Sequence, residues 1–580
     1  MKGRKVFIFF TILIALCAFG LSAADAPKEL PRNETLYING LQWGPPANFN
    51  PLSTNAAFPV GYVNNYLLVY ETLFMFNQLT GQSEPLLGKS FAWTDKLSLK
   101  VELNPAAKWN DGKDLNAADV VYSYMAAKRY ALPWSAYMDY IDSVTAQGDS
   151  TVLIKLNPAK PNRLYALDSL NKVYIVPQHV WEPIESQDGK DITKISQEFN
   201  ANPVGSGAYK VMFYDDTRII CQRDDNYWGK ALFGKLPAPK YIAHMIYKSN
   251  DAGTNAFRQH EVDVSQQFIN KVWDLWKKGE PYKTYLDKIP YYLPGGTPSI
   301  TFNMTKKGLG DNVEVRRAIA MCIDYKKIAE VAMSNYSDQV VPGIILQTPS
   351  EKPLVDESAV KSLWYKQDAA AANKLLDSIG AMKGADGIRV LKDGTRLGPW
   401  DVSCPYGWSD WNASLEIVVQ SAKKIGIDLR TKFPEFPVWY NDVKNGNFDI
   451  CMWSTTNPGV AQPWDRARDK MDSTGVPPIG QPVVSNSNFG RYKNARADEL
   501  IDKIPQETDQ AKLKEMYTEL DKIFLTDLPI VQLMYRPSLF YTVYEGVWKG
   551  LPDSKSNPSN VPPTPEMGSF IKALYNISAK

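Results

Sequence analysis

Aromatic side chains gather in stretches of this sequence that have the composition of loops. The densest group, Tyr406, Trp408 and Trp411, lies in CPYGWSDW, and Trp43 and Trp453 lie in two further loop-like stretches. A flat ring suits a sugar, because one face of a pyranose carries C–H bonds that stack on a π cloud. Packing in a core is the alternative for any one ring. We predict that these five rings contact a carbohydrate.

Sugar hydroxyls project at the edge of the ring and need planar polar partners. An amide or a carboxylate can meet a hydroxyl in the ring plane as donor or acceptor. The side chains of this kind that we assign to the site are Asn48, Asn50, Gln267, Asn270, Asp410, Asn412 and Asn457. Together with the aromatic rings they form the predicted ligand site.

The elements that position these side chains can be read best in KWNDGKDLNAADVVYSYM, residues 108–125. Asn116 is a helix N-cap, and Asp119 stands three residues later, where its carboxylate can reach free backbone N–H groups. A helix should therefore begin at Ala117. The helical period turns Ser123 outward and places an apolar face against a core: Val120, Val121, Tyr124 and Met125.

Short strands alternate with helices along the whole chain, which predicts a mixed α/β fold. The clearest strand-like runs are Thr35 to Ile38, Leu97 to Leu103, Thr151 to Leu156, Arg218 to Gln222, Ile300 to Asn303 and Ile530 to Met534. The clearest helix-like runs are Ala118 to Lys128, Val313 to Met333, Asp368 to Ser378, Ala413 to Ile425 and Asp509 to Phe524.

Five segments together resemble the family 5 extracellular solute-binding proteins of ABC importers. They are residues 108–125, NPVGSGAYKV with RDDNYWG at 202–229, VRRAIAMCID at 315–324, FGRYKNARADEL at 489–500 and DLPIVQLMYR at 527–536. The resemblance covers essentially the whole chain from about residue 33. It implies the two-lobed periplasmic-binding-protein fold with three domains (cluster C type).

This resemblance also implies a domain division. Lobe I would hold a core domain of residues 33–84, 204–298 and 535–580, with a smaller domain, 85–203, inserted in it; lobe II would be 299–534. Pro and Gly support a crossing between lobes near Leu293 to Gly296, because they combine fixed and free φ angles. The return crossing is expected near Leu533 to Arg536.

Within the family, ETLYING, NFNPL and CPYGWSDW look most like the branch that binds cellobiose and related β-glucan oligosaccharides. Peptide-binding members carry a carboxylate just after the tryptophan that corresponds to Trp453, whereas here Ser454 to Asn457 are neutral. The resemblance therefore implies a receptor that captures a β-linked oligosaccharide by lobe closure and delivers it to the membrane subunits of a permease. An oligopeptide receptor of the same family is the alternative.

Enzymatic alternatives find little support in the sequence. His179, His244 and His260 lack the spacing of metal ligands, and no cofactor or metal is expected. The segment Gly205 to Gly207 lacks the spacing of a nucleophile elbow and is predicted to form a tight turn. A glycoside hydrolase stays as a remote alternative, because two of the 63 acidic residues could meet in space.

The first 24 residues are predicted to be a signal peptide, with basic residues, an apolar run and then small residues. Cys17 has the outline of a lipoprotein site, but Leu16 stands where a small residue is preferred. A cleaved, periplasmic protein is therefore expected, without a membrane-spanning helix and as a monomer. A net charge of +2 gives no reason to expect nucleic acid or anionic lipid as a partner.

Four cysteines follow the signal segment, and none forms a close pair in sequence. Cys322 is expected to be a buried free thiol on the apolar face of its helix. Cys404 and Cys451 lie beside the candidate ligand loops and are the pair to examine for a disulfide.

Overall fold

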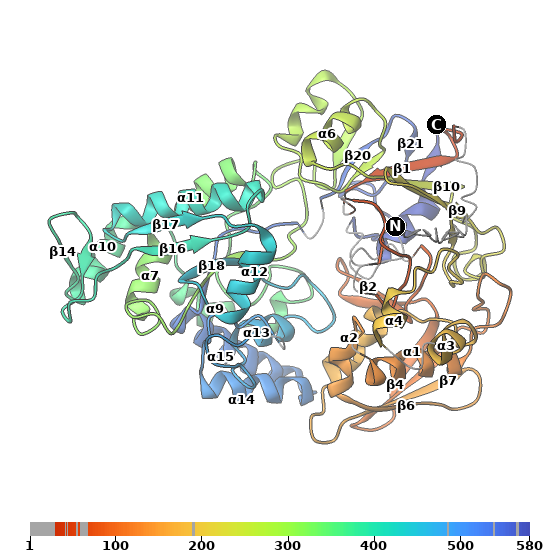
Figure 1. Cartoon of the computed structure of the whole chain (residues 1–580), viewed down its shortest axis with the longest axis horizontal. Helices are drawn as coiled ribbons and strands as arrows, with labels where there is room; N and C mark the ends of the chain where they lie inside the picture. The colour runs from red at the N-terminus through yellow and green to blue at the C-terminus, as the bar shows by residue number, and fades with distance from the viewer. Residues whose placement is uncertain are drawn as a thin grey trace, which may run out of the picture.

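The computed structural model describes residues 29–40, 42, 44–53, 56–57, 68–130, 132–187, 192–483, 486–537, 540–563 and 568–580 of the 580. The predicted signal peptide, residues 1–24, and Trp43 lie outside these ranges. The described chain folds into two lobes of mixed α/β structure, which confirms the predicted fold class (Figure 1). Within the described ranges, no helix is long and apolar enough to cross a membrane.

Lobe I contains a seven-stranded mixed sheet in the order β12-β20-β11-β1-β10-β9-β8. Its central strand β1 runs parallel to both neighbours, β10 and β11, and the other pairs are antiparallel. The strands are β1 (Thr35–Asn39), β8 (Tyr209–Tyr214), β9 (Arg218–Arg223), β10 (Tyr241–Met245), β11 (Val264–Ser265), β12 (Tyr282–Thr284) and β20 (Thr542–Tyr544). The C-terminal segment thus returns to the sheet that the N-terminal segment begins.

A second part of lobe I is an antiparallel sheet in the order β4-β5-β7-β6, covered by helices. Its elements are β4 (Gly88–Trp93), β5 (Ser98–Leu103), β6 (Ile141–Ala146), β7 (Thr151–Leu156), α1 (Ala117–Arg129), α2 (Arg163–Lys172), α3 (Gln178–Gln187) and α4 (Ile192–Gln197). The hairpin β2 (Phe74–Asn77) and β3 (Gln82–Pro85) leads into it. Figure 1 shows this part below the seven-stranded sheet.

Helix α1 has the predicted cap. The side chain of Asn116 accepts a hydrogen bond from Ala118 N–H (2.8 Å), and Asp119 accepts one from Asn116 N–H (3.0 Å). The outward orientation predicted for Ser123 is wrong. Its buried hydroxyl donates to the Asp119 carbonyl (2.7 Å) and accepts from Val176 N–H (2.9 Å), because the segment after α2 packs on that face of the helix.

Lobe II is built on a sheet in the order β17-β16-β18-β13-β19. Its strands are β13 (Pro298–Phe302), β16 (Trp400–Ser403), β17 (Leu429–Lys432), β18 (Ile450–Ser454) and β19 (Ile530–Gln532). Its main helices are α7 (Val313–Cys322), α10 (Ala369–Ser378), α11 (Ser409–Lys424), α12 (Phe436–Asn445), α13 (Trp464–Met471), α14 (Ala495–Lys503) and α15 (Gln510–Asp527).

The single helix predicted for Val313 to Met333 is interrupted. Ile323 is extended, with ψ 134°, and the side chain of Asp324 caps a new turn by accepting from Lys327 N–H (3.0 Å). An Asp that bonds to nearby backbone competes with helix continuation. The segment therefore splits into α7, α8 (Tyr325–Lys327) and a π-helical turn, Ile328–Ala332.

Shorter elements complete the described structure. They are α5 (Lys230–Phe233), α6 (Asn250–Arg258), α9 (Glu357–Val360), α16 (Ala573–Asn576), β14 (Met382–Lys383), β15 (Arg389–Val390), β21 (Trp548–Lys549), β22 (Ser578–Ala579), and the 3-10 turns η1 (Ser135–Asp139), η2 (Val272–Asp274), η3 (Trp276–Lys278), η5 (Lys352–Leu354), η6 (Lys361–Leu363), η7 (Ile504–Gln506) and η9 (Ser569–Lys572).

The two segments predicted to cross between the lobes lie side by side. Gly295 N–H donates to the Arg536 carbonyl (2.9 Å), and Arg536 N–H donates to the Gly296 carbonyl (3.0 Å). The domain bounds predicted above remain a proposal. It is supported by the strands of the three main sheets, which fall within the proposed ranges except for Pro298 at the start of β13.

The Gly205 to Gly207 segment has a structural role. A Cβ atom added at Gly207 would lie 2.2 Å from the Leu68 carbonyl oxygen, so only glycine fits beside that backbone. The Ser206 carbonyl accepts a hydrogen bond from the Trp228 indole (2.9 Å). The four cysteines of the described chain are buried free thiols, so Cys404 and Cys451 form no disulfide.

Candidate functional site

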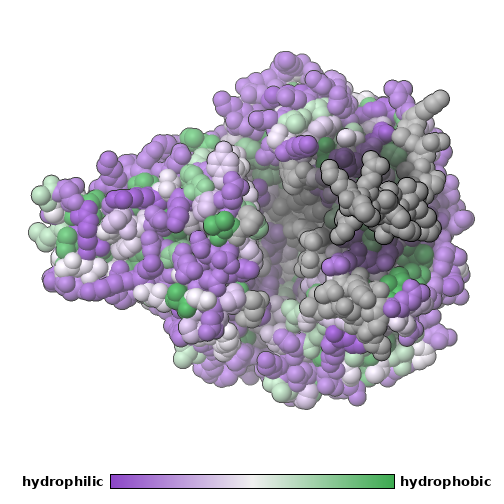
Figure 2. Space-filling model, viewed as in Figure 1, coloured by the Kyte–Doolittle hydropathy of each residue, from purple (hydrophilic) through white to green (hydrophobic). Residues whose placement is uncertain are grey.

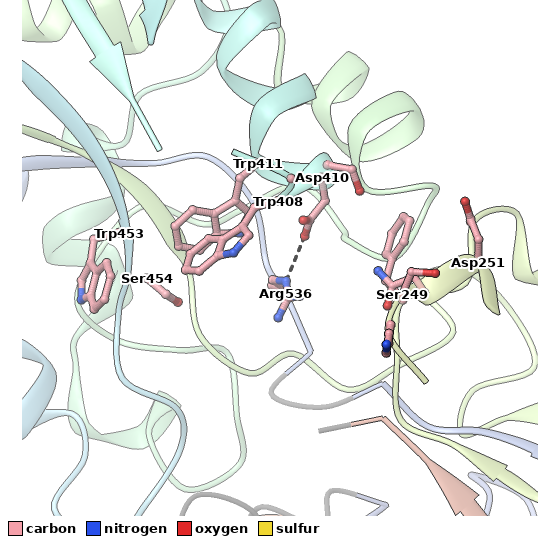
Figure 3. Close-up of a pocket in the computed structure, with 13 residues that line it drawn as sticks. Ser249, Asp251, Trp408, Asp410, Trp411, Trp453, Ser454 and Arg536 are labelled. Atoms are coloured by element: carbon pink, nitrogen blue, oxygen red, sulfur yellow. Dashed lines mark hydrogen bonds and ion pairs between the residues drawn. The ribbon is translucent and has the colours of Figure 1, made fainter. Parts of the chain in front are cut away.

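A cavity of about 800 Å³ lies between the lobes, within the usual size range of ligand pockets. Figure 2 shows the surface hollowed between the lobes, and Figure 3 shows the lining residues. Lobe I contributes Lys248, Ser249, Asn250, Asp251 and Phe268; lobe II contributes Gly407, Trp408, Ser409, Asp410, Trp411, Trp453 and Ser454; Arg536 comes from the return crossing.

The starts of two helices, α11 and α6, contribute residues to this cavity. Strand β16 ends at Ser403, and the loop after it leads into α11, whose first turn carries Asp410 and Trp411. Helix α6 begins opposite, with Ser249 as its N-cap accepting from Ala252 N–H (3.2 Å). Unpaired N–H groups at helix starts favour polar or anionic ligand groups.

Tryptophan rings from two segments form the apolar wall. Trp408 meets Trp411 edge to face, with ring centroids 4.9 Å apart at 83°. Trp453 stands at the end of β18, beside Ser454, and is partly exposed like Trp408. The structure thus brings these three predicted aromatic residues together in one cavity (Figure 3).

An ion pair crosses the cavity wall. Arg536 Nε lies 2.9 Å from Asp410 Oδ2, and Figure 3 places the arginine between the tryptophans and α6. Asp410 is buried, so its carboxylate gains from a charge-assisted partner. A sugar that bonds to Asp410, as predicted, would therefore share its carboxylate with Arg536.

Two predicted amides have local structural roles. Asn48 accepts from Asn50 N–H (3.0 Å) and donates to the Ser53 hydroxyl (3.2 Å). Asn50 accepts from Leu52 N–H (2.8 Å) and donates to the Ile195 carbonyl (2.6 Å). Both are buried and neither lines the cavity, so we leave both out of the proposed site.

Three further predicted amides form hydrogen bonds with segments next to the cavity. Gln267 donates to the Asn250 carbonyl (2.6 Å), which positions the start of α6. Asn270 accepts from the Ser334 hydroxyl (2.9 Å), and Asn412 donates to the Pro405 carbonyl (3.0 Å) below the tryptophan loop. None of the three belongs to the lining.

Tyr406 and Asn457 flank the site without lining it. Tyr406 is 68% exposed, one residue before the lining Gly407. Asn457 Oδ1 would lie 3.2 Å from a Cβ atom at Gly296, which places its side chain at the first crossing. Their predicted roles as ligand contacts stay predictions.

Lys248 to Asp251, Phe268 and Arg536 were missed by the sequence reasoning. Arg536 was recognisable only as the end of the predicted return crossing. It meets Asp410 across 126 residues of chain, a separation at which no local pattern operates. The four residues at α6 carried the signal of a helix start, but nothing indicated that this start faces lobe II.

The histidines do not form a reactive centre. Burial lowers the pKa of His244 to about 3, and its Nε2 lies 2.6 Å from the Gly40 carbonyl oxygen. His260 stacks on Tyr544 with centroids 4.1 Å apart, and His179 contacts Asp111 (2.8 Å). In the described part of the chain, no group of three or more His, Cys, Asp or Glu residues could hold a metal ion.

Comparisons with known proteins give a consistent assignment. The model of "Bacterial extracellular solute-binding proteins, family 5 Middle" matches residues 82–467. A structure of an oligopeptide ABC transporter periplasmic oligopeptide-binding protein from Thermotoga maritima is 29% identical, with TM-score 0.86 over 95% of this chain and 100% of that one.

Two further similarities concern ligands. The structure of the same Thermotoga maritima protein with mannohexaose bound is also 29% identical, covers 95% of this chain and 100% of that one, and has TM-score 0.80. The oligopeptide-binding protein AppA of Bacillus subtilis is 23% identical over 92% of this chain and 94% of its own length.

Proposed function

Because this chain belongs to the family 5 bacterial extracellular solute-binding proteins, which are binding receptors of ABC importers and not enzymes, we propose that its ligand is a β-linked oligosaccharide. The proposal is supported by three tryptophans in one interlobe cavity, Trp408, Trp411 and Trp453. Neutral residues follow Trp453, so the cavity offers no carboxylate there for a peptide amino group. We further propose a periplasmic, monomeric receptor with a cleaved signal peptide.

Lobe closure would couple capture to delivery. The cavity takes its lining from both lobes, so a ligand makes all of its contacts only when the lobes are together. A ligand with such differential contacts shifts the equilibrium toward the closed form. The permease would then receive the closed, loaded receptor.

An oligopeptide is the second candidate, and charged lining residues favour it. Lys248, Asp251, Asp410 and Arg536 could pair with the termini or side chains of a peptide. The relatives that are named as oligopeptide-binding proteins, including AppA, also favour a peptide ligand. Against this candidate, Asp410 and Arg536 already neutralise each other at 2.9 Å.

Calorimetric titration of the refolded protein with cellobiose, laminaribiose, mannohexaose and a mixed peptide pool tests this proposal. We expect saturable heat with a saccharide, and saccharide recovered unchanged. Trp408→Ala should weaken that binding by about thirtyfold, the effect of removing a stacked hot-spot ring worth about 2 kcal/mol.

Trp93→Ala, on strand β4 of lobe I and outside the cavity lining, is the matched control and should leave affinity unchanged. Heat with peptides alone would reject the saccharide proposal. An unchanged saccharide affinity in Trp408→Ala would remove that ring from the site.

A further inference from the structure

Two lining tryptophans are joined by a row of stacked rings outside the cavity. Trp408 stacks on Phe436 (centroids 5.8 Å apart, 27° between planes), Phe436 on Tyr440 (5.5 Å, 10°) and Tyr440 on Trp453 (5.6 Å, 19°). The end rings come from the α11 loop and from β18, while the middle rings come from α12. We call these four residues the aromatic row.

Helix α12 presents a single aromatic face to the row. Phe436, Trp439 and Tyr440 stand at i, i+3 and i+4, so their rings lie on one side of the helix. Trp439 is 1% exposed and donates to the Ser403 hydroxyl (3.2 Å). It contacts both end rings, with centroids 5.5 Å from Trp453 and 6.3 Å from Trp408, and so anchors the row to the sheet.

The two middle rings are unusual as packing residues. Phe436 is 41% exposed, and Tyr440 is partly buried against a small cluster that includes Trp439 and Phe489. Each of the two is nevertheless stacked with two other rings of the row, and Lys444 Nζ also lies over the Tyr440 ring, 4.6 Å from its centroid. Such stacking restrains the orientation of the end rings, because aromatic pairs prefer an offset arrangement with a particular separation and tilt.

We propose that Phe436 and Tyr440 are positioning residues that set the spacing of Trp408 and Trp453, and that this spacing selects saccharides long enough to contact both rings. This inference rests on the proposed function. The affinity of a ligand that contacts one ring does not depend on the spacing of the two rings, whereas the affinity of a ligand that contacts both rings does. Helix α12 would therefore determine the preferred ligand length without touching the ligand.

The test compares Phe436→Leu and Tyr440→Leu with two controls. Tyr440→Phe keeps the ring, and Val438→Ala changes a residue of the same helix that is 58% exposed and outside the row. Near-ultraviolet circular dichroism of the free protein reports the tryptophan environment. Titrations with mannohexaose and with mannose report the dependence on length.

We expect both Leu variants to change the near-ultraviolet spectrum and to lose about three- to tenfold in mannohexaose affinity, the range given by one aromatic contact. The weaker binding of mannose should not change further. Both controls should behave as the parent protein. Unchanged spectra, or mannohexaose affinities within about twofold of the parent, would overturn the inference.

Failure of the proposed function has a different signature. In that case the parent protein binds the peptide pool and no saccharide. The same four variants are then titrated with the peptides, and the spectra of the free proteins still decide whether Phe436 and Tyr440 position the tryptophans.

Discussion

Substitution of Arg466 by Met is expected to lower the free energy of unfolding by about 3–5 kcal/mol, because it leaves a buried carboxylate without its partner. Arg466 Nη1 lies 2.7 Å from Glu351 Oε2, and the two side chains are 1% and 2% exposed. The guanidinium also donates to the carbonyls of Ile344 (2.7 Å) and Thr456 (3.2 Å). It thus ties the residues after Trp453 to the segment around Ile344.

Chemical denaturation followed by circular dichroism measures this effect. Arg496→Met is the matched control, because Arg496 is an exposed arginine of the same lobe that pairs with Glu499 and Glu519. Exposed pairs contribute little, so this variant should unfold almost as the parent does. Equal denaturation midpoints for Arg466→Met and Arg496→Met would show that the buried ion pair stabilises the protein no more than the exposed one does.

The second large effect is expected from the loss of a contact between the lobes. Tyr165, on α2 of lobe I, donates its hydroxyl to Asp465 of α13 in lobe II (2.5 Å) and accepts from Arg468 (3.0 Å). Its ring meets Trp464 edge to face at 4.9 Å and is 7% exposed. Burial raises the pKa of Asp465, a carboxyl for which Tyr165 is a hydrogen-bond donor. This contact holds the lobes together on the α2 side.

We expect Tyr165→Phe to weaken the association of the lobes by about 1 kcal/mol, because it leaves the partly buried Asp465 without that donor. The ratio of closed to open protein should fall by about tenfold for each 1.4 kcal/mol, and ligand affinity should fall with the closed fraction. Small-angle X-ray scattering and interlobe energy transfer measure the separation. Titration measures the affinity.

Tyr124→Phe is the control, because it removes a buried hydroxyl that is bonded to Ser169 (3.2 Å) within lobe I. It should affect the stability of lobe I and leave the lobe separation unchanged. If Tyr165→Phe altered neither separation nor affinity, the contact would not control closure.

Local structure followed closely from the sequence. The strand Thr151–Leu156 and the cap of α1 were read correctly, because alternation and capping depend on residues a few positions apart. Ser123 was misread, since its burial depends on Val176 N–H, which arrives from another segment. The break after α7 was missed because the cap at Asp324 stops a pattern that remains apolar.

The candidate site, too, was predictable from the sequence only in part. The sequence by itself identified the family and the tryptophan loop, because both depend on residue types at short spacing. Only the tertiary structure showed that Arg536 pairs with Asp410 and that α6 faces the tryptophans. Asn48 and Asn50 have suitable chemistry, but an Asn side chain in a loop can also hydrogen-bond the backbone near it, as both of these do. A cavity between lobes depends on contacts between segments that are far apart in the chain, and short-range hydrogen bonding and periodicity do not encode those contacts.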